Sequence, residues 1–360
     1  MAAPPAETAE AAETAAAPAP PRGAPVEWLA VAGGQIDADS HGDVNLGVRR
    51  GAWTLQLRTD APELTWAPSG ERGRAWVTVR GHAFAAAMYI SPWAGGAPDP
   101  DRALRASSVG GEAGWVGYGP GGLYAGGRAS LDGVFFGAMP ETAFDVPSPR
   151  AVATLDALVG LWRPGLSAWM RAGVDFTDDG AGGGRRAPHL AGELHWTPDL
   201  HVGSLALAPR VEAWAGLAGN QDDLLHARIG GVNPWVVPLA GAAWAEWWAE
   251  DYAAVRAGPT VGVGDPGARS LGVRVSPFVD LAAFGGGTGD QGHALGLGVG
   301  MRAWRGRLFA DVTGGYAPGI ARQAGVGRGS VWVAVGWDWG TAKGPTSAAA
   351  PGPMGTYWPG

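Results

Sequence analysis

Apolar residues recur at every second position along most of this chain, and the segment GSVWVAVGWDWG (329–340) shows the pattern clearly. Successive side chains of a β-strand point to opposite faces, so this segment predicts a strand with one continuous apolar face and one small, mixed face. The apolar face carries Val331, Val333, Val335, Trp337 and Trp339, and the mixed face carries Trp332, Ala334, Gly336 and Asp338.

The same alternation predicts about 14 strands, with 12 or 16 within the error of the boundaries. VEWLAVAG (26–33) is either a short first strand or a plug-like lead-in. Several predicted strands run well beyond the five or six residues that are usual in soluble proteins. The predicted strands are 43–50, 52–59, a run from 73 to about 89, 104–118, 122–138, 151–162, 166–177, 189–197, 204–217, 242–256, 269–284, 292–304, 306–316 and 328–339.

The connections between these strands alternate in length. The short ones are 67–72, 119–121, 163–165, 198–203, 257–268 and 305, and the long ones are 92–103, 139–150, 178–188, 218–241, 285–291 and 317–327. Short turns on one side and long loops on the other are typical of a single-chain antiparallel transmembrane β-barrel, with the turns in the periplasm. The sequence therefore predicts an all-β barrel of this kind. A soluble β-sandwich, or a pair of them, is the alternative.

Composition favours the barrel. The chain holds 62 glycines and 19 tryptophans in 360 residues. Glycine makes room on the crowded face of a strand, and tryptophan prefers the membrane–water boundary. The absence of cysteine excludes disulfides, zinc–thiolate sites and thiol nucleophiles, and the mild net charge of −7 without a basic cluster argues against nucleic-acid binding. No apolar run is long enough for a transmembrane helix.

The chain divides into three parts by composition. Residues 1–25 are rich in Ala, Pro, Glu and Thr and predict a disordered arm, residues 26–340 predict the barrel, and residues 341–360 predict a flexible tail. The N-terminus lacks the basic and apolar regions of a signal peptide. We interpret it as a mature form with an added Met; a truncated reading frame or a non-membrane protein are the alternatives.

Charged residues recur within the strands only on the mixed face, which predicts a lumen lined by both signs of charge. Many of these charges come as opposite signs two or four residues apart on one strand, such as Arg171 and Asp175, and pairs two apart on one face can bridge directly or across to a neighbouring strand. The lumen is then either a selective pore or filled by salt-bridged side chains, and inward aromatic residues such as Trp169 argue against a wide channel. The predicted lumen residues are Arg58, Arg128, Asp132, Arg171, Asp175, Glu193, Arg210, Glu212, Arg274, Asp280, Arg302, Arg307, Asp311 and Asp338.

No constellation for catalysis stands out. Among the seven histidines, His195 with Glu193 is the best candidate for a general base, and His189, His195 and His201 are spaced six residues apart, about 20 Å along a strand. We therefore predict no catalytic residues, no metal site and no cofactor. Gly-rich runs such as 285–292 are predicted loop tips, since no helix follows them.

Residues 42–340 resemble a bacterial outer-membrane β-barrel. The patterning carries this resemblance, together with Val333, Val335, Trp337 and Trp339, which look like the assembly signal in the terminal strand of such barrels. The resemblance implies a location in the bacterial outer membrane, contacts with outer-membrane lipids and lipopolysaccharide, and recognition by the barrel-assembly machinery. Trp53 and the terminal tryptophans are expected at the membrane boundary.

A weaker resemblance lies in ARIGGVNPWVVPLAG (227–241), which is similar to an Arg-x-Gly-Gly … Pro-Leu-x-Gly segment in barrels of the assembly-factor and two-partner-secretion superfamily. The Val-Arg-Gly-aromatic loop tip typical of that superfamily is absent near the C-terminus, so no insertase or secretion function is carried over. The segment is otherwise a long extracellular loop that folds over or into the lumen. The residues concerned are Arg228, Gly230, Gly231, Pro234, Pro238 and Gly241.

The sequence thus predicts a non-enzymatic outer-membrane barrel, either a porin-like channel or a structural barrel with a mixed-charge lumen. An outer-membrane lipid-modifying enzyme that uses His195, and an adhesion or scaffold barrel that presents its long loops, are the alternatives. No nucleic-acid partner is expected.

Overall fold

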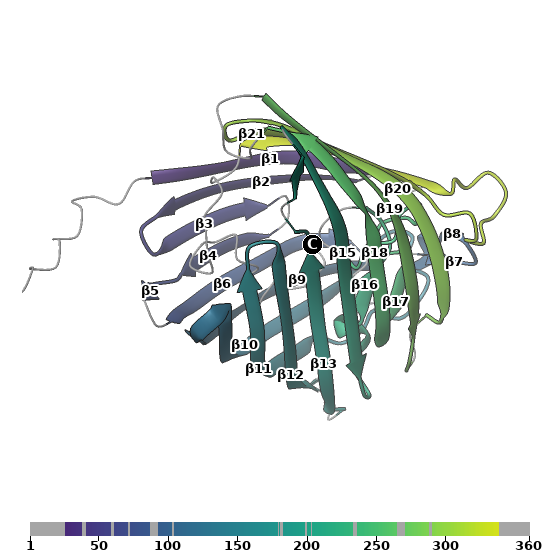
Figure 1. Cartoon of the computed structure of the whole chain (residues 1–360). Helices are drawn as coiled ribbons and strands as arrows, with labels where there is room; N and C mark the ends of the chain where they lie inside the picture. Colours follow the sequence, from purple (N-terminus) through teal and green to yellow (C-terminus); the bar gives the residue numbers. More distant parts are fainter. Residues whose placement is uncertain are drawn as a thin grey trace, which may run out of the picture.

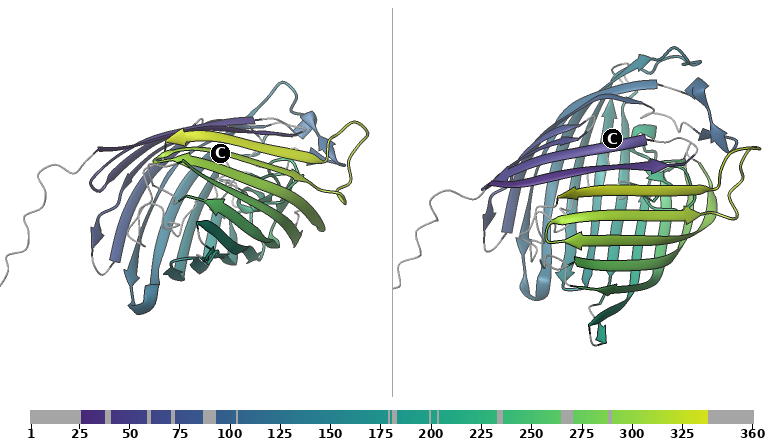
Figure 2. Two further views of the ribbon diagram at one scale, coloured as in Figure 1. Left: turned by 45° about the horizontal axis from the view of Figure 1, so that its top comes forward. Right: turned by 90° about the horizontal axis from the view of Figure 1, so that it is seen from above.

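The computed structural model describes residues 26–37, 41–58, 61–70, 73–86, 93–102, 104–178, 180, 183–198, 200–202, 204–232, 236–264, 271–287 and 290–337. These residues form a closed antiparallel β-barrel (Figures 1 and 2), as the alternation predicts. The predicted arm 1–25 and tail 341–360 lie outside the described residues. No helix in the described part of the chain is long and apolar enough to cross a membrane.

Sixteen strands make the wall, and each pairs with its neighbours in chain order. Short strands β5 (Ser69–Gly70) and β14 (His201–Val202) extend the pairing at one end. The wall strands are β1 (Val26–Ile36), β2 (His41–Arg50), β3 (Trp53–Arg58), β4 (Pro62–Trp66), β6 (Gly73–Ala86), β9 (Leu104–Tyr118), β10 (Leu123–Ala138), β11 (Arg150–Arg163), β12 (Leu166–Asp178), β13 (Arg185–Trp196), β15 (Leu205–Ala218), β18 (Asp251–Val263), β19 (Leu271–Gly285), β20 (Gly292–Arg305), β21 (Leu308–Tyr316) and β22 (Gly329–Trp337).

The barrel closes where the first strand meets the last. β1 pairs with β22 from Ala30↔Trp337 to Ile36↔Val331, and its other edge pairs with β2. The segment at 26–33 is therefore a wall strand and not a lead-in. This strand and β4, which lies in a stretch that the sequence assigned to no strand, raise the count from about 14 to 16. Closure leaves no unpaired sheet edge, which a membrane requires of a spanning sheet.

The two faces of the wall differ in exposure, as the alternation of side chains along each strand predicts. On β22, Val331, Val333, Val335 and Trp337 are 39–53% exposed, whereas Ser330, Trp332 and Ala334 between them are 1–8% exposed. The other wall strands also expose large apolar side chains on the outside, including Trp53, whose ring lies 6.5 Å from that of Trp66. The outer surface is therefore an apolar band suited to lipid.

One predicted strand is wrong at its start. The sequence predicts a strand over 242–256, but the structure begins β18 at Asp251 and continues it to Val263, through the predicted connection 257–268. The apolar run 240–249 misleads because its residues are buried inside the barrel and not on the lipid face, where the alternation would place them. Ala240, Ala242 and Ala249 are fully buried.

The connection between β15 and β18 turns into the barrel, and we call residues 219–250 the lumen loop. It contains a short 3-10 helix, η3 (Asp223–Leu225), and a two-stranded sheet of β16 (Ala227–Ile229) and β17 (Trp247–Ala249). Figure 1 shows β16 and β17 within the curve of the wall. A second small sheet, β7 (Trp93–Ala94) and β8 (Ala97–Pro98), precedes β9 in the chain and lies at one end of the barrel in Figure 1.

Replacing Leu131 by Arg tests the orientation of the wall. Leu131 lies near the middle of β10 and is 63% exposed on the outer face. Because arginine at the bilayer midplane costs about 2–4 kcal/mol, we expect Leu131→Arg to lower the free energy of unfolding in lipid vesicles by that amount. The control is Leu200→Arg, which is 51% exposed in a turn. Equal stability of the two variants would contradict the placement of Leu131 on the lipid-facing side of the wall.

Candidate functional site: the charged lumen and its loop

Oppositely charged side chains on the inner wall meet across strands. Arg80 on β6 donates to Asp132 on β10, with Nη2 2.7 Å from Oδ2 and Nε 3.1 Å from Oδ1. Its Nη1 also lies 3.2 Å from Oε2 of Glu112 on β9, the strand between them. All three side chains are at most 4% exposed. A buried ion pair with this many hydrogen bonds fixes three strands relative to one another.

The network continues along the wall through Asp156 on β11. Arg128 donates to its Oδ2, the Nε2 of His189 lies 2.6 Å from its Oδ1, and Arg171 approaches at 4.0 Å. Arg128 also lies 3.6 Å from Glu112, which joins the two halves. A continuous chain of charges therefore crosses the inner face from β6 to β13.

Each of the two inward histidines on β13 faces two carboxylates. Nδ1 of His189 lies 2.9 Å from Asp175, opposite its contact with Asp156. Both ring nitrogens of His195 are hydrogen-bonded, to Glu193 at 3.3 Å and to Glu212 at 3.4 Å. Imidazole between two carboxylates can donate to both of them when each ring nitrogen carries a proton. Neither histidine presents a free basic nitrogen, so this geometry does not suit general-base catalysis.

The ion pairs differ from the predicted pairs along single strands. Arg128 and Asp132 bind different partners, and Asp175 accepts hydrogen bonds from Thr154 at 2.7 Å and Gln221 at 3.0 Å. Arg210 and Glu212, two apart on β15, do pair directly at 2.7 Å. Residues four apart on one strand lie about 13 Å apart, whereas residues opposite each other on neighbouring strands lie about 5 Å apart, so the cross-strand pairing forms.

The placement of Arg307 is wrong. It was expected on the inner face of a strand at 306–316, but β21 begins at Leu308 and Arg307 is exposed in the two-residue turn after β20. Asp311 pairs instead with Arg302 on β20, at 3.5 Å. The turn needs two residues, with Gly306 at φ +63°, which leaves Arg307 no place in the ladder.

The other predicted lumen residues lie on the inner face. Asp338 and Trp339 lie outside the described residues. Several members of the network were missed as lumen candidates, above all Arg80, Glu112 and Arg256, although each has the inward parity of its strand. The predicted lumen residues that the structure places on the inner face are Arg58 on β3, Arg128 and Asp132 on β10, Arg171 and Asp175 on β12, Glu193 on β13, Arg210 and Glu212 on β15, Arg274 and Asp280 on β19, Arg302 on β20 and Asp311 on β21.

The lumen loop is organised around Arg228. This side chain is 3% exposed, and its guanidinium lies over the Trp248 ring, 3.2 Å from the ring centroid. It donates to the backbone carbonyls of His226 at 2.7 Å and Leu224 at 3.3 Å. Burial lowers the pKa of Arg228 well below its ordinary value, and the charge of Asp223 opposes that shift. Arg228 thus ties η3 to β17 and holds the loop in one shape.

Glycines let the loop fold back on itself and lie against the wall. Gly230 and Gly231 have φ of +121° and +96°, and Gly231 exchanges backbone hydrogen bonds with Leu239. A Cβ on Gly315 of β21 would lie 2.4 Å from the Cβ of Ala240. Pro238 lies within the folded loop, and Pro234 lies outside the described residues.

Polar side chains of the wall bind the loop backbone. Val232 N donates to Gln35 of β1 at 3.1 Å, Ala240 N to Asp280 of β19 at 2.7 Å, and Gly241 N to Ser330 of β22 at 3.0 Å. Asp280 also holds Arg256 of β18 through two hydrogen bonds of 2.7 and 2.8 Å. At its start the loop binds the other side of the wall, where Asp222 pairs with Arg150 of β11 and Gln221 donates to Asp175 of β12. The loop therefore spans the lumen between these two parts of the wall.

The outer rim also holds the loop. Arg322, in the connection between β21 and β22, pairs with Glu246 of the lumen loop through both of its terminal nitrogens. The same guanidinium lies 4.9 Å from the centre of the Trp93 ring of β7. Burial raises the pKa of Glu246, and the facing Arg322 opposes that shift. Among the residues that the structure describes, no group of His, Asp and Glu could hold a metal ion.

No family model matches the sequence, and no curated protein matches it. Solved structures do match. CdiB from Acinetobacter baumannii aligns with 87% of this chain and 60% of its own, at 12% identity and a TM-score of 0.57. CdiB from Escherichia coli covers 86% and 63% at 10% identity and TM-score 0.58. BamA from Haemophilus ducreyi covers 86% and 70% at 12% identity and TM-score 0.53.

These likenesses show the fold. The chain is a closed antiparallel β-barrel that is similar in fold to the barrels of CdiB and BamA. It spans about three fifths of the length of the CdiB chains that it matches.

Truncating Arg80 tests whether the charge network supports the wall. Arg80→Ala leaves Asp132 buried without its cation and leaves Glu112 with only the longer contact to Arg128, which is expected to lower the free energy of unfolding by about 3–5 kcal/mol. Arg302→Ala is the control, because Arg302 is 45% exposed and its pair with Asp311 is long, so the loss should stay below about 1 kcal/mol. Urea unfolding in detergent measures both; equal losses would contradict a supporting role for the network.

Proposed function

We propose that this protein is a non-enzymatic conduit of the bacterial outer membrane, which the lumen loop closes at rest. The observation that carries the proposal is the position of the loop. It enters the barrel, spans the lumen and binds the wall through hydrogen bonds to Gln35, Asp280 and Ser330.

The nature of these contacts favours a movable closure. The loop is joined to the wall by backbone-to-side-chain hydrogen bonds and by the ion pair of Glu246 with Arg322, and the chain has no cysteine to fix it covalently. Water can replace each of these polar partners once the loop leaves the lumen, at a net cost of about 0.5–1.5 kcal/mol per bond. Displacement also exposes apolar loop residues such as Ile229 and Leu239, which pack with Trp214 and Ala282 of the wall. The mixed charges of the wall would then line a polar path.

The same reasoning disfavours the lipid-modifying enzyme. His195 and His189 each face two carboxylates and offer no free nitrogen to a substrate. The apolar outer face supports the proposed contacts with outer-membrane lipids and lipopolysaccharide. Val333, Val335 and Trp337, in line on the outer face of β22, support recognition by the barrel-assembly machinery.

Loosening the loop should open the conduit. The double substitution Gln35→Ala with Ser330→Ala removes two acceptors and leaves the amides of Val232 and Gly241 unpaired, at about 1–3 kcal/mol each. We expect the open probability in planar bilayers to rise at least tenfold. The control is Thr260→Ala with Ser276→Ala, which removes a buried hydrogen bond of 2.9 Å within the wall and leaves the loop contacts intact.

A cross-link provides the converse test. Glu246→Cys with Arg322→Cys places the chain's only two thiols on the loop and the rim, where a short bis-maleimide can join them. We expect frequent openings before cross-linking and none after it. Equal conductance before and after, or no conductance steps from any variant, would refute closure by the lumen loop.

A further inference from the structure

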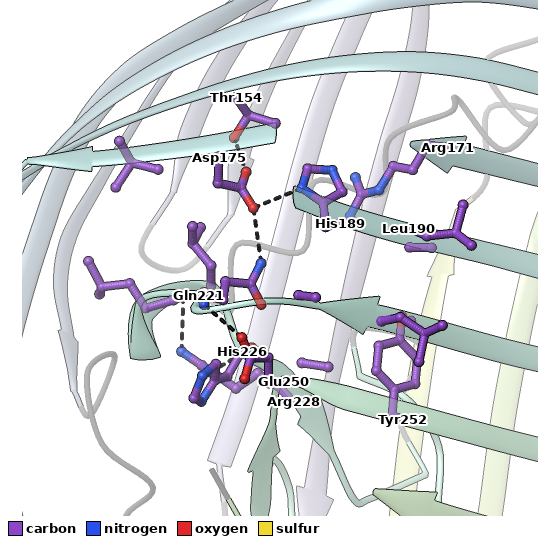
Figure 3. Close-up of a pocket in the computed structure, with 18 of the residues that line it drawn as sticks. Thr154, Arg171, Asp175, His189, Leu190, Gln221, His226, Arg228, Glu250 and Tyr252 are labelled. Carbon is purple, nitrogen blue, oxygen red and sulfur yellow. Dashed lines mark hydrogen bonds and ion pairs between the residues drawn. The ribbon is translucent and has the colours of Figure 1, made fainter. Parts of the chain in front are cut away.

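A partly enclosed cavity lies between the lumen loop and the wall. It has a volume of about 120 Å³ and is lined by residues of β6, β10 to β13, β15 and β18 on one side and by residues of the lumen loop on the other. Figure 3 shows Arg171, His189 and Tyr252 on the wall strands, with Gln221, His226 and Arg228 facing them from the loop. Since a water occupies about 30 Å³ of liquid, the cavity has room for a few waters or one small polyatomic ion.

Positive charge predominates in the lining. Four arginines and two histidines line the cavity, against three carboxylates. Each carboxylate is already engaged: Asp132 by Arg80, Asp175 by Thr154 and Gln221, and Glu250 by the backbone amide of Gln221 at 2.7 Å. The carboxylate oxygens that line the cavity thus largely have hydrogen-bond donors within the protein, whereas some N–H and O–H donors in the lining have no acceptor.

Arg171 is the donor with the weakest partner. Its nearest carboxylate oxygen, Oδ2 of Asp156, is 4.0 Å away and already binds Arg128, while the other oxygen of Asp156 binds His189. Its Nε is buried and has no hydrogen-bond partner among the described residues. One carboxylate shared by three cations leaves the guanidinium of Arg171 incompletely neutralised, and a buried donor without a partner is costly.

Tyr252 is held in place beside it. Its ring lies flat against the backbone of β15, where a Cβ on Gly216 would come within 2.3 Å of the ring carbon Cε1. Gly216 and Tyr252 are directly opposite each other in the ladder. Within the part of the chain that the structure describes, the Tyr252 hydroxyl makes no hydrogen bond, so it adds a second fixed donor to the lining of the cavity.

We propose that this cavity is a binding site for a small oxyanion, such as phosphate, held by the Arg171 guanidinium and the Tyr252 hydroxyl. Planar guanidinium groups match the oxygen geometry of such anions. The site lies inside the barrel, away from the lipid face, so the ligand is a free anion and not a lipid headgroup. Because the loop forms part of the lining, the bound anion joins loop to wall. Binding requires only the arrangement seen here, so it does not depend on conduction.

The test is isothermal titration of the full chain, in a maltoside detergent without phosphate groups, with sodium phosphate at constant ionic strength. We expect one phosphate per chain. Arg171→Gln should weaken binding at least tenfold, because it removes the charge, and Tyr252→Phe by about three- to tenfold, the loss of one hydrogen bond. The matched control is Arg210→Gln, which removes an inward arginine outside the cavity and should bind within twofold of wild type.

A shift in gel mobility between unheated and boiled samples confirms that each variant is folded. Should Arg171→Gln not fold, Tyr252→Phe against Arg210→Gln decides the question. No binding by the wild-type chain, or equal affinity of Tyr252→Phe and Arg210→Gln, would overturn the proposal. Conductance measured with and without phosphate separates the two ideas: anion binding in a protein that never conducts refutes the conduit alone, and conduction without binding refutes the anion site alone.

Discussion

The hydrogen bonding of the backbone is the constraint on which the rest of this molecule depends. In hydrocarbon no water satisfies a free N–H or C=O, so a spanning sheet must close on itself. Here closure depends on seven residue pairs between β1 and β22, fewer than most neighbouring strands share. Closure creates an outer face that meets lipid and an inner face shielded from it. The charge network, the lumen loop and the cavity all depend on that separation.

The enclosed inner face explains how the charges are arranged. A charge that leaves bulk water is stabilised only by close partners. The wall meets this need by sharing: Asp156 serves three cations, and Glu112 serves Arg80 and Arg128. The shared carboxylates connect the strands from β6 to β13 through a continuous series of ion pairs. Sharing also leaves Arg171 with the weakest contact, which is why the proposed anion site lies there.

The opposite sector is built differently. Along β19 to β22 and β1 the inner face carries small residues and polar acceptors, and the lumen loop fills the space. Gly296 and Gly315 make room for Ala240, while Gln35 and Ser330 bind the backbone amides of the loop. One side of the wall is thus braced by its own side chains and the other by an inserted segment.

The sequence by itself determined the fold class, because alternation is a local property: the parity of Val331, Val333, Val335 and Trp337 follows from the strand geometry alone. It also placed Arg128, Asp175 and Asp280 on the inner face. The tertiary structure alone decided that Arg80 meets Asp132 across 52 residues of chain, that 240–249 lies in the lumen, and that Arg171 and Tyr252 share a cavity. Such pairings follow from the register between strands and from the path of one loop, and both depend on contacts between residues far apart in the chain.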